Sequence, residues 1–301
     1  MDIQQLRCFL AVAEELHFGR AAERLHMTAS PLSRIVKELE RDLGTELFIR
    51  GYHQIQLTPA GQEMVRRVPS LLAEFDRLRN EVLIVAAGAD RAARLGTSHL
   101  APPGVVDAVV ESVEKSRRAE VTLGPSAILL SAITRGELDA AVVHLPVDDP
   151  GVEALPLASY RFLVAMRRDD ELADRTEIAV ADLAHRDVVS YPLTLQPLAM
   201  QQLRDELVAK GLHQLRTLPH ADSALIAAHV RRTGDLTFTL APETGGSARV
   251  YDDPAFAIVP LTDGPKFHLG LVWMAHRAAD AVVAGVVDAV RARWVDGEMT
   301  I

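Results

Sequence analysis

Five polar side chains near the N-terminus have types suited to binding a nucleic acid. They are Thr28, Ser30, Ser33, Arg34 and Lys37. On a helix Ser30, Ser33, Arg34 and Lys37 share one broad face with Arg41, so hydroxyls and cations would point to the same side. Such groups hydrogen-bond to phosphate oxygens and to the base edges of the DNA major groove. A helical hairpin with a solvated charged face would show the same spacing, so the spacing alone leaves both interpretations open.

The apolar residues of the same stretch predict two short helices joined by a tight corner at His26 and Met27. They are Ala21, Ala22, Leu25, Leu32, Ile35, Val36, Leu39 and Leu43. Thr28 is suited to cap the second helix, and Pro31 falls in its first turn, where a missing N–H costs little. A helix buried along this apolar face would present its polar residues outward, as a recognition helix does.

The neighbouring segments predict a first helix and a wing. Apolar residues at helical spacing over residues 3–16 could close a core over the helical pair. Residues 47–50 and 55–57 alternate with period two, which predicts a short hairpin. Arg50 and His53 would then lie in a wing that contacts the DNA backbone or minor groove.

Thr58 and Pro59 predict the start of a long helix, which we expect to reach residue 88. Its apolar positions follow a heptad pattern: Met64, Val68, Leu71, Phe75, Leu78 and Val82. A single seam cannot bury itself, so a second copy would form a dimer and present two recognition helices to a two-fold symmetric site. Packing of the helix on its own domain is the alternative. Pro69 should remove one backbone hydrogen bond and bend the helix.

The composition is that of a soluble globular protein of two or three domains, with 301 residues and 49% hydrophobic residues. Because no signal peptide or membrane-spanning run is recognisable, we expect a cytoplasmic protein without a membrane partner. The single cysteine, Cys8, excludes an internal disulfide framework, and a small hydrophobic residue in a helix is a better interpretation of it than a redox role.

The net charge of −9 is unevenly distributed. Residues 1–67 contain nine Lys or Arg and nine Asp or Glu, so the whole excess of anions lies beyond residue 67. Any affinity for DNA must therefore come from cations gathered on one face, and the acidic remainder would point away from phosphate.

Beyond residue 89 the chain alternates strand and helix, which predicts parallel sheets with covering helices. We expect strands at residues 94–98, 120–123, 140–143, 161–165, 188–191, 215–218, 236–240 and 267–275, and helices at residues 103–115, 128–134, 196–210, 223–231 and 278–294. If the last strand and helix return to the first sheet, the chain crosses between two lobes twice. Two crossings make a hinged clamp with a ligand cleft at the carboxyl ends of the strands.

Six residues near these strand ends are candidates for binding an effector: Thr97, Ser98, Ser126, His144, Tyr191 and Thr194. Free N–H groups at helix starts near Ser98 and Ser126 favour an anion, so a small carboxylate is the first guess for the ligand. Helix capping by the two serines is an equally good interpretation, and a structural, hydrogen-bonded role is the better one for His144.

Sequence signatures of catalysis are lacking. The chain contains no G-x-S-x-G elbow, no phosphate loop and no H-E-x-x-H or paired-cysteine metal spacing. We therefore expect neither an enzyme nor a cofactor or metal. The alternative is a two-lobed small-molecule binding protein or enzyme whose N-terminal domain serves dimerisation only.

The N-terminal pattern resembles the winged helix-turn-helix of LysR-type transcriptional regulators. The matching segments are residues 6–9, 12–14, 21–25, 31–34, 39–40, 43–44, 47–48 and 57–61. Residues 94–96, 136–139 and 269–273 resemble the periplasmic-binding-protein-like effector domain of the same family. Ala29 and Ser30 depart from the family's usual Gln-Pro pair, and because alanine cannot make a bidentate base contact, the operator sequence is left open.

The resemblance implies an α/β chain with a winged helix-turn-helix at residues 1–58, a linker helix at 59–88 and a two-lobed effector domain at 89–301. Lobe I would comprise residues 91–160 and 267–301, and lobe II residues 161–266. The family implies a homodimer or homotetramer that binds double-stranded promoter DNA and a small-molecule effector, with RNA polymerase as a further partner if it activates transcription. By position, Thr28, Ser30, Ser33, Arg34 and Arg50 would contact DNA.

Overall fold

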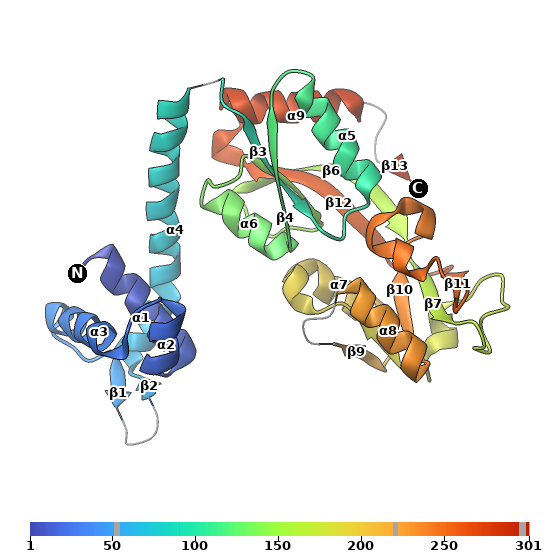
Figure 1. Ribbon diagram of the computed structural model, residues 1–301, viewed down its shortest axis with the longest axis horizontal. Helices are drawn as coiled ribbons and strands as arrows, with labels where there is room; N and C mark the ends of the chain where they lie inside the picture. The colour runs from blue at the N-terminus through green and yellow to red at the C-terminus, as the bar shows by residue number, and fades with distance from the viewer. Residues whose placement is uncertain (51–54, 89, 219–221, 295–298, 301) are drawn as a thin grey trace. The chain divides into compact units, whose positions relative to one another are not determined.

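The computed structural model in Figure 1 describes residues 1–50, 55–88, 90–218, 222–294 and 299–300. The chain divides into two compact units, residues 1–83 and 84–301. No helix in the described ranges is long and apolar enough to cross a membrane.

The first unit is a helix-turn-helix with a small hairpin. Its elements are α1 (Ile3–Glu15), α2 (Phe18–Arg24), α3 (Ala29–Leu43), β1 (Phe48–Arg50), β2 (Ile55–Leu57) and most of α4 (Pro59–Ala87). The predicted helices, corner and strands are confirmed. In the core, Leu32 and Leu39 are fully buried, and the rings of Phe9 and Phe48 lie 5.4 Å apart.

Local contacts fix the corner and the hairpin relative to α3. His26 adopts a left-handed φ of 55°, which turns the chain before Thr28 begins α3 as its N-cap. The Thr28 hydroxyl makes no capping hydrogen bond in the described chain, contrary to the usual behaviour of a threonine cap. The Glu40 carboxylate on α3 accepts the backbone N–H groups of Leu47 at 2.9 Å and Phe48 at 3.2 Å, and these bonds tie β1 to the helix.

The long helix α4 starts as predicted, because Thr58 Oγ1 accepts the N–H of Gly61 at 3.0 Å. The helix continues through Pro69 to Ala87. The early seam residues Met64 and Val68 pack into the core of the first unit. The later seam residues are 43–61% exposed: Leu71, Phe75, Leu78 and Val82. Packing on its own domain therefore accounts for the beginning of the helix and leaves the rest of the seam uncovered.

The second unit contains two sheets. The six-stranded sheet has the order β13-β6-β12-β5-β3-β4, and the five-stranded sheet has the order β11-β7-β10-β8-β9. The strands are β3 (Ala93–Ser98), β4 (Ala119–Gly124), β5 (Ala140–His144), β6 (Val152–Arg161), β7 (Leu163–Arg167), β8 (Val188–Ser190), β9 (Leu215–Thr217), β10 (Leu236–Thr239), β11 (Phe256–Pro260), β12 (Lys266–Met274) and β13 (Met299–Thr300). The helices are α5 (Pro103–Glu114), α6 (Ser126–Thr134), α7 (Pro197–Ala209), α8 (Ser223–Thr233) and α9 (Ala281–Arg293), with 3-10 turns η1 (Val180–Leu183), η2 (Leu193–Leu195), η3 (Pro242–Thr244), η4 (Gly246–Tyr251) and η5 (Ala275–Arg277).

The prediction of parallel sheets is wrong in part. Strands β3, β4 and β5 run parallel, but β12 is antiparallel to β5 and β6, and β7 is antiparallel to β10 and β11. The sequence interpretation missed β6, β11 and β13, and its strand at residues 161–165 straddles the junction of β6 and β7. Parallel neighbours need a long crossover, usually a helix. A strand that passes directly from one sheet to the other needs no such crossover, so it can pair antiparallel with its neighbours.

Two segments join the sheets, as predicted. Phe162 alone separates β6 from β7, and residues 261–265 separate β11 from β12. Because β12 pairs with β5 and β6, the chain returns to the six-stranded sheet. This double connection joins the two lobes, and Phe162 lines the cleft between them.

Helices cover both faces of the six-stranded sheet (Figure 1). Alternate residues of a strand point to opposite faces. Accordingly, Ala140 and Val142 of β5 belong to the core that includes α5 and α9, whereas Ala141 and Val143 belong to the core with α6. Strand β5 is buried throughout, so its end is held firmly at the cleft.

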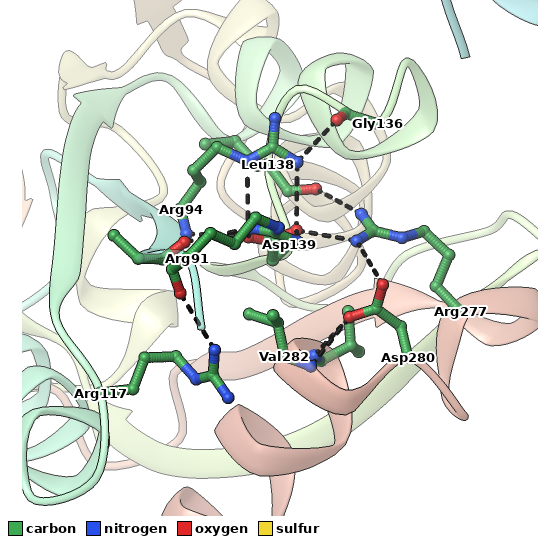
Figure 2. Close-up of polar contacts among 11 residues, drawn as sticks. Arg91, Arg94, Arg117, Gly136, Leu138, Asp139, Arg277, Asp280 and Val282 are labelled. Atoms are coloured by element: carbon green, nitrogen blue, oxygen red, sulfur yellow. Dashed lines mark hydrogen bonds and ion pairs between the residues drawn. The ribbon is translucent and has the colours of Figure 1, made fainter. Parts of the chain in front are cut away.

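A buried carboxylate joins three arginines where the chain enters the second unit (Figure 2). Asp139, whose side chain is 0% exposed, accepts hydrogen bonds from Arg91 at 2.6 and 2.8 Å, from Arg94 at 3.1 Å and from Arg277 at 2.8 Å. Burial alone would raise the pKa of Asp139, but the hydrogen bonds from Arg91 and Arg94 outweigh it and hold that pKa far below its ordinary value. The cluster thus fastens the segment after α4 to β3, β5 and η5.

Candidate nucleic-acid interface and ligand cleft

Helix α3 separates its apolar and polar residues as the sequence predicted. Leu32, Val36 and Leu39 are fully buried. On the other side, Ser30, Arg34 and Lys37 are exposed and Ser33 is half-buried, and Thr28 is exposed at the N-cap.

The Arg34 side chain is 78% exposed, and its closest carboxylate, that of Glu38, lies 3.9 Å away. An ion pair this long and this exposed contributes little stability. The guanidinium is therefore available to a phosphate or a guanine edge.

The structure describes only part of the predicted wing. Arg50 pairs in register with Ile55 at the end of the two strands. The Arg50 side chain and the whole of His53 lie outside the described part of the structure, so their DNA contacts stay predictions.

In the second unit, Ser98, Ser126 and His144 converge at the ends of β3, α6 and β5. Ser98 Oγ lies 3.5 Å from His144 Nε2, and Ser126 Oγ lies 3.3 Å from His144 Nδ1. Ser126 Oγ also accepts the backbone N–H of His144 at 3.2 Å, and Ser98 Oγ accepts that of Leu100 at 3.4 Å. Both hydroxyls are thus engaged within the protein.

His144 is 1% exposed. Burial, with a smaller contribution from the charge of His99, lowers the pKa of His144 to about 3. The imidazole is therefore neutral near pH 7, which agrees with the structural, hydrogen-bonded interpretation. The neighbouring Thr97 is also buried, and its hydroxyl donates to the Ser98 carbonyl at 3.4 Å.

The two residues predicted from the second lobe lie in different environments. Tyr191 lines a cavity; burial raises its pKa to about 12, although hydrogen bonds with Ser223 and Ser247 act in the opposite direction. Thr194 is exposed on η2 and is not among the described residues that line this cavity.

This cavity lies between the lobes. Its lining residues are Leu100, Phe162, Ser190, Tyr191, Met200, Leu203, Phe238, Thr239, Leu240, Ser247 and Phe267. Leu100 and Phe267 come from the strands and turns of the first sheet, and Phe162 is the connecting residue itself. The sequence interpretation named only Tyr191 from this set. The sequence does show an aromatic residue, Phe162 or Phe267, near each connection between the sheets. That these rings meet could not be predicted, because strand β6 was missed.

Gln196 is a further residue that the sequence interpretation did not name as a candidate. It is 2% exposed. Its amide nitrogen donates to the carbonyls of Pro146 at 2.6 Å and His144 at 3.3 Å, while its oxygen accepts the N–H of Ala199 in the first turn of α7. One side chain therefore caps a helix of the second lobe and binds the first lobe beside His144.

Two family models match the chain. The model described as a bacterial regulatory helix-turn-helix protein of the lysR family matches residues 3–62, and the LysR substrate binding domain matches residues 86–295. The chain belongs to the LysR family. It is a DNA-binding transcriptional regulator with an effector-binding domain, and the interpretation as an enzyme is excluded because family and relatives are named as regulators.

Named relatives agree with this assignment. The transcriptional regulator IlvR of Caulobacter vibrioides is 31% identical over 93% of this chain and 94% of its own length. ShiR of Corynebacterium glutamicum is 31% identical, over 64% of this chain and 66% of ShiR, so that match covers slightly less than two-thirds of the relative. Full-length CbnR, solved in complex with its target DNA, has a TM-score of 0.58 at 20% identity and covers 97% of this chain and 99% of CbnR, which shows a shared fold.

Proposed function

We propose that this regulator binds promoter DNA in a sequence-specific manner through α3 and its wing, as a homodimer or homotetramer. In this proposal a small molecule in the interlobe cleft changes the geometry of the oligomer and so changes transcription. If the regulator is an activator, RNA polymerase is its further partner.

The main support for DNA binding is that the apolar and polar side chains of α3 lie on opposite faces of the helix. Three aliphatic side chains fix one face of the helix in the core, while Ser30, Arg34 and Lys37 remain exposed on the other. A module that served dimerisation only would have no need to keep this polar face free. The complex of CbnR with its target DNA supports the same assignment by fold.

The exposed seam of α4 supports the oligomer. Leu71, Phe75, Leu78 and Val82 are apolar, regularly spaced and uncovered in the single chain. A second α4 would bury them in a coiled-coil arrangement.

An electrophoretic mobility shift experiment tests the DNA-binding part. We expect the full chain to retard DNA flanking its gene at low salt, and Arg34→Ala to weaken binding by about fivefold or more, since one bidentate arginine–base contact is worth roughly 1–3 kcal/mol. Arg232→Ala removes an exposed arginine from α8 and should leave the affinity unchanged. Equal affinities for both variants and the unmodified chain would overturn the assignment of α3.

A further inference from the structure

The interlobe cavity has walls without formal charge among the residues that the structure describes. Seven of the lining residues are aliphatic, Met or Phe, and the polar ones contribute only hydroxyls. The rings of Phe162 and Phe238 lie 5.8 Å apart, as do those of Phe162 and Phe267. Apolar walls with a few convergent polar groups are typical of small-molecule sites.

The groups that would bind an anion do not line this cavity. Ser98 and Ser126 hydrogen-bond to His144 and to backbone N–H groups. Leu100 and Phe267, which do line the cavity, are the neighbours of this polar group: Leu100 donates its N–H to Ser98, and the Phe267 ring lies 4.5 Å from that of His144.

A carboxylate in such a cavity would lose its hydration without gaining a cation. Transfer of an ionised group into an apolar environment without a partner is strongly unfavourable. His144 offers no compensation at neutral pH, because burial keeps its imidazole uncharged. The hydroxyls of Ser190 and Thr239 donate to the carbonyls of Tyr191 at 3.4 Å and Leu240 at 3.0 Å. Their oxygens can still accept a hydrogen bond from a neutral donor such as an amide N–H, whereas a carboxylate has no proton to donate to them.

We propose that the effector of this cleft is a small, uncharged and mostly apolar molecule with one or two hydrogen-bonding groups, rather than a carboxylate. This proposal rests on the proposed function, in which the cleft is the effector site. The cavity encloses about 50 Å³, and one water needs roughly 10–15 Å³. A ligand larger than a few atoms would therefore bind with the lobes moved apart at the cleft.

Matched pairs of amides and carboxylates test the ligand class with the full chain at pH 7.5 and constant ionic strength. The pairs are isobutyramide with isobutyrate, benzamide with benzoate, and phenylacetamide with phenylacetate. A ligand that binds the native state raises Tm by mass action. We expect a shift from at least one amide and none from its carboxylate partner, with the difference confirmed by calorimetric titration.

Two substitutions at Leu203, which lines the cavity from α7, test whether the ligand binds in this cavity. Leu203→Trp fills the cavity and should abolish the amide shift. Leu203→Lys adds a cation to the wall and should make the carboxylate the preferred partner; because Leu203 is half-buried, the lysine can reach water. Leu225→Trp and Leu225→Lys are the matched controls, since Leu225 is 57% exposed on α8, and both should behave as the unmodified chain.

A carboxylate that raises Tm of the unmodified chain and loses this effect in Leu203→Trp would overturn the proposal while leaving effector binding intact. The absence of a shift from every amide would also overturn it. DNA retardation by the same preparation reports separately on the regulator itself.

Discussion

At His144, burial removes the charge that an exposed histidine carries below pH 6.5. The side chain contacts Ser98, Ser126 and Phe267, so protonation would place a cation among hydroxyls and an aromatic ring. The same environment that makes the cleft unsuited to anions makes the fold sensitive to acid.

His144 should therefore make stability depend on pH. Its pKa is about 3 in the folded chain, against an ordinary value of 6.5 for histidine. The unfolded chain takes up this proton first as the pH falls, so the contribution is complete above pH 6.5 and is lost towards pH 3. We expect the free energy of unfolding to fall by roughly 1 kcal/mol per pH unit below pH 6.

Urea denaturation across pH 7.5 to 5 measures this slope. His144→Gln should remove the contribution, whereas His213→Gln, at an exposed position, should retain it. An unchanged slope in His144→Gln would show that another group is responsible.

For single residues, the sequence predicted where the candidate side chains lie better than it predicted which groups they hydrogen-bond to. Strand-end reasoning located Ser98, Ser126 and His144, because carboxyl ends of neighbouring parallel strands meet at one edge. It did not find that the serines are occupied by His144, because that contact joins residues 46 and 18 positions apart. Gln196 was missed for the same reason: its partners lie 50 and 52 positions away.

Among the elements, α4 could be predicted from the sequence and the Asp139 cluster could not. The heptad pattern of α4 was recognisable because it is local and periodic, although the sequence did not show that its first part packs on its own domain. The Asp139 cluster joins three segments distant in sequence, so periodicity could not indicate it. The strands β6 and β11 were missed because both belong to direct passages between the sheets and lack the helical crossovers on which the interpretation relied.

The uncovered seam predicts an oligomer that a single charge can disrupt. Leu78→Glu should lower the molar mass in sedimentation by a factor of two or more without unfolding the chain, because Leu78 is 58% exposed and the glutamate is desolvated only in the oligomer. Arg79→Gln changes the net charge equally at the adjacent exposed position outside the seam and should keep the mass. An unaltered mass for Leu78→Glu would count against α4 as the interface.

The Asp139 cluster predicts a large loss of stability from a small change. Asp139→Asn keeps the shape but leaves three buried or half-buried guanidiniums without their carboxylate. Removal of one partner of a buried ion pair costs roughly 3–5 kcal/mol. Asp288→Asn, in a pair that is 75% exposed on the Asp288 side, should cost almost nothing by urea denaturation. Similar losses for the two variants would refute the structural role of Asp139.

For the whole molecule, the winged helix-turn-helix, the long helix and the two-lobed domain together follow the LysR pattern. Charge distribution agrees with that organisation: the first 67 residues are balanced, and the acidic excess lies in the remainder. Ala29 and Ser30 lie at the start of α3, where α3 would meet DNA, and neither offers a bidentate base contact. We therefore propose that the bases read by this regulator depend on Arg34 and the neighbouring hydroxyls.

Sequencing of the DNA recovered with the full-length protein from fragmented genomic DNA tests the central claim most directly. The account predicts a small set of enriched fragments that share two half-sites related by two-fold symmetry, with centres about one DNA turn apart or a multiple of it. It also predicts that Arg34→Ala loses this enrichment. Recovery of fragments spread evenly over the genome, with the same distribution for Arg34→Ala, would contradict it.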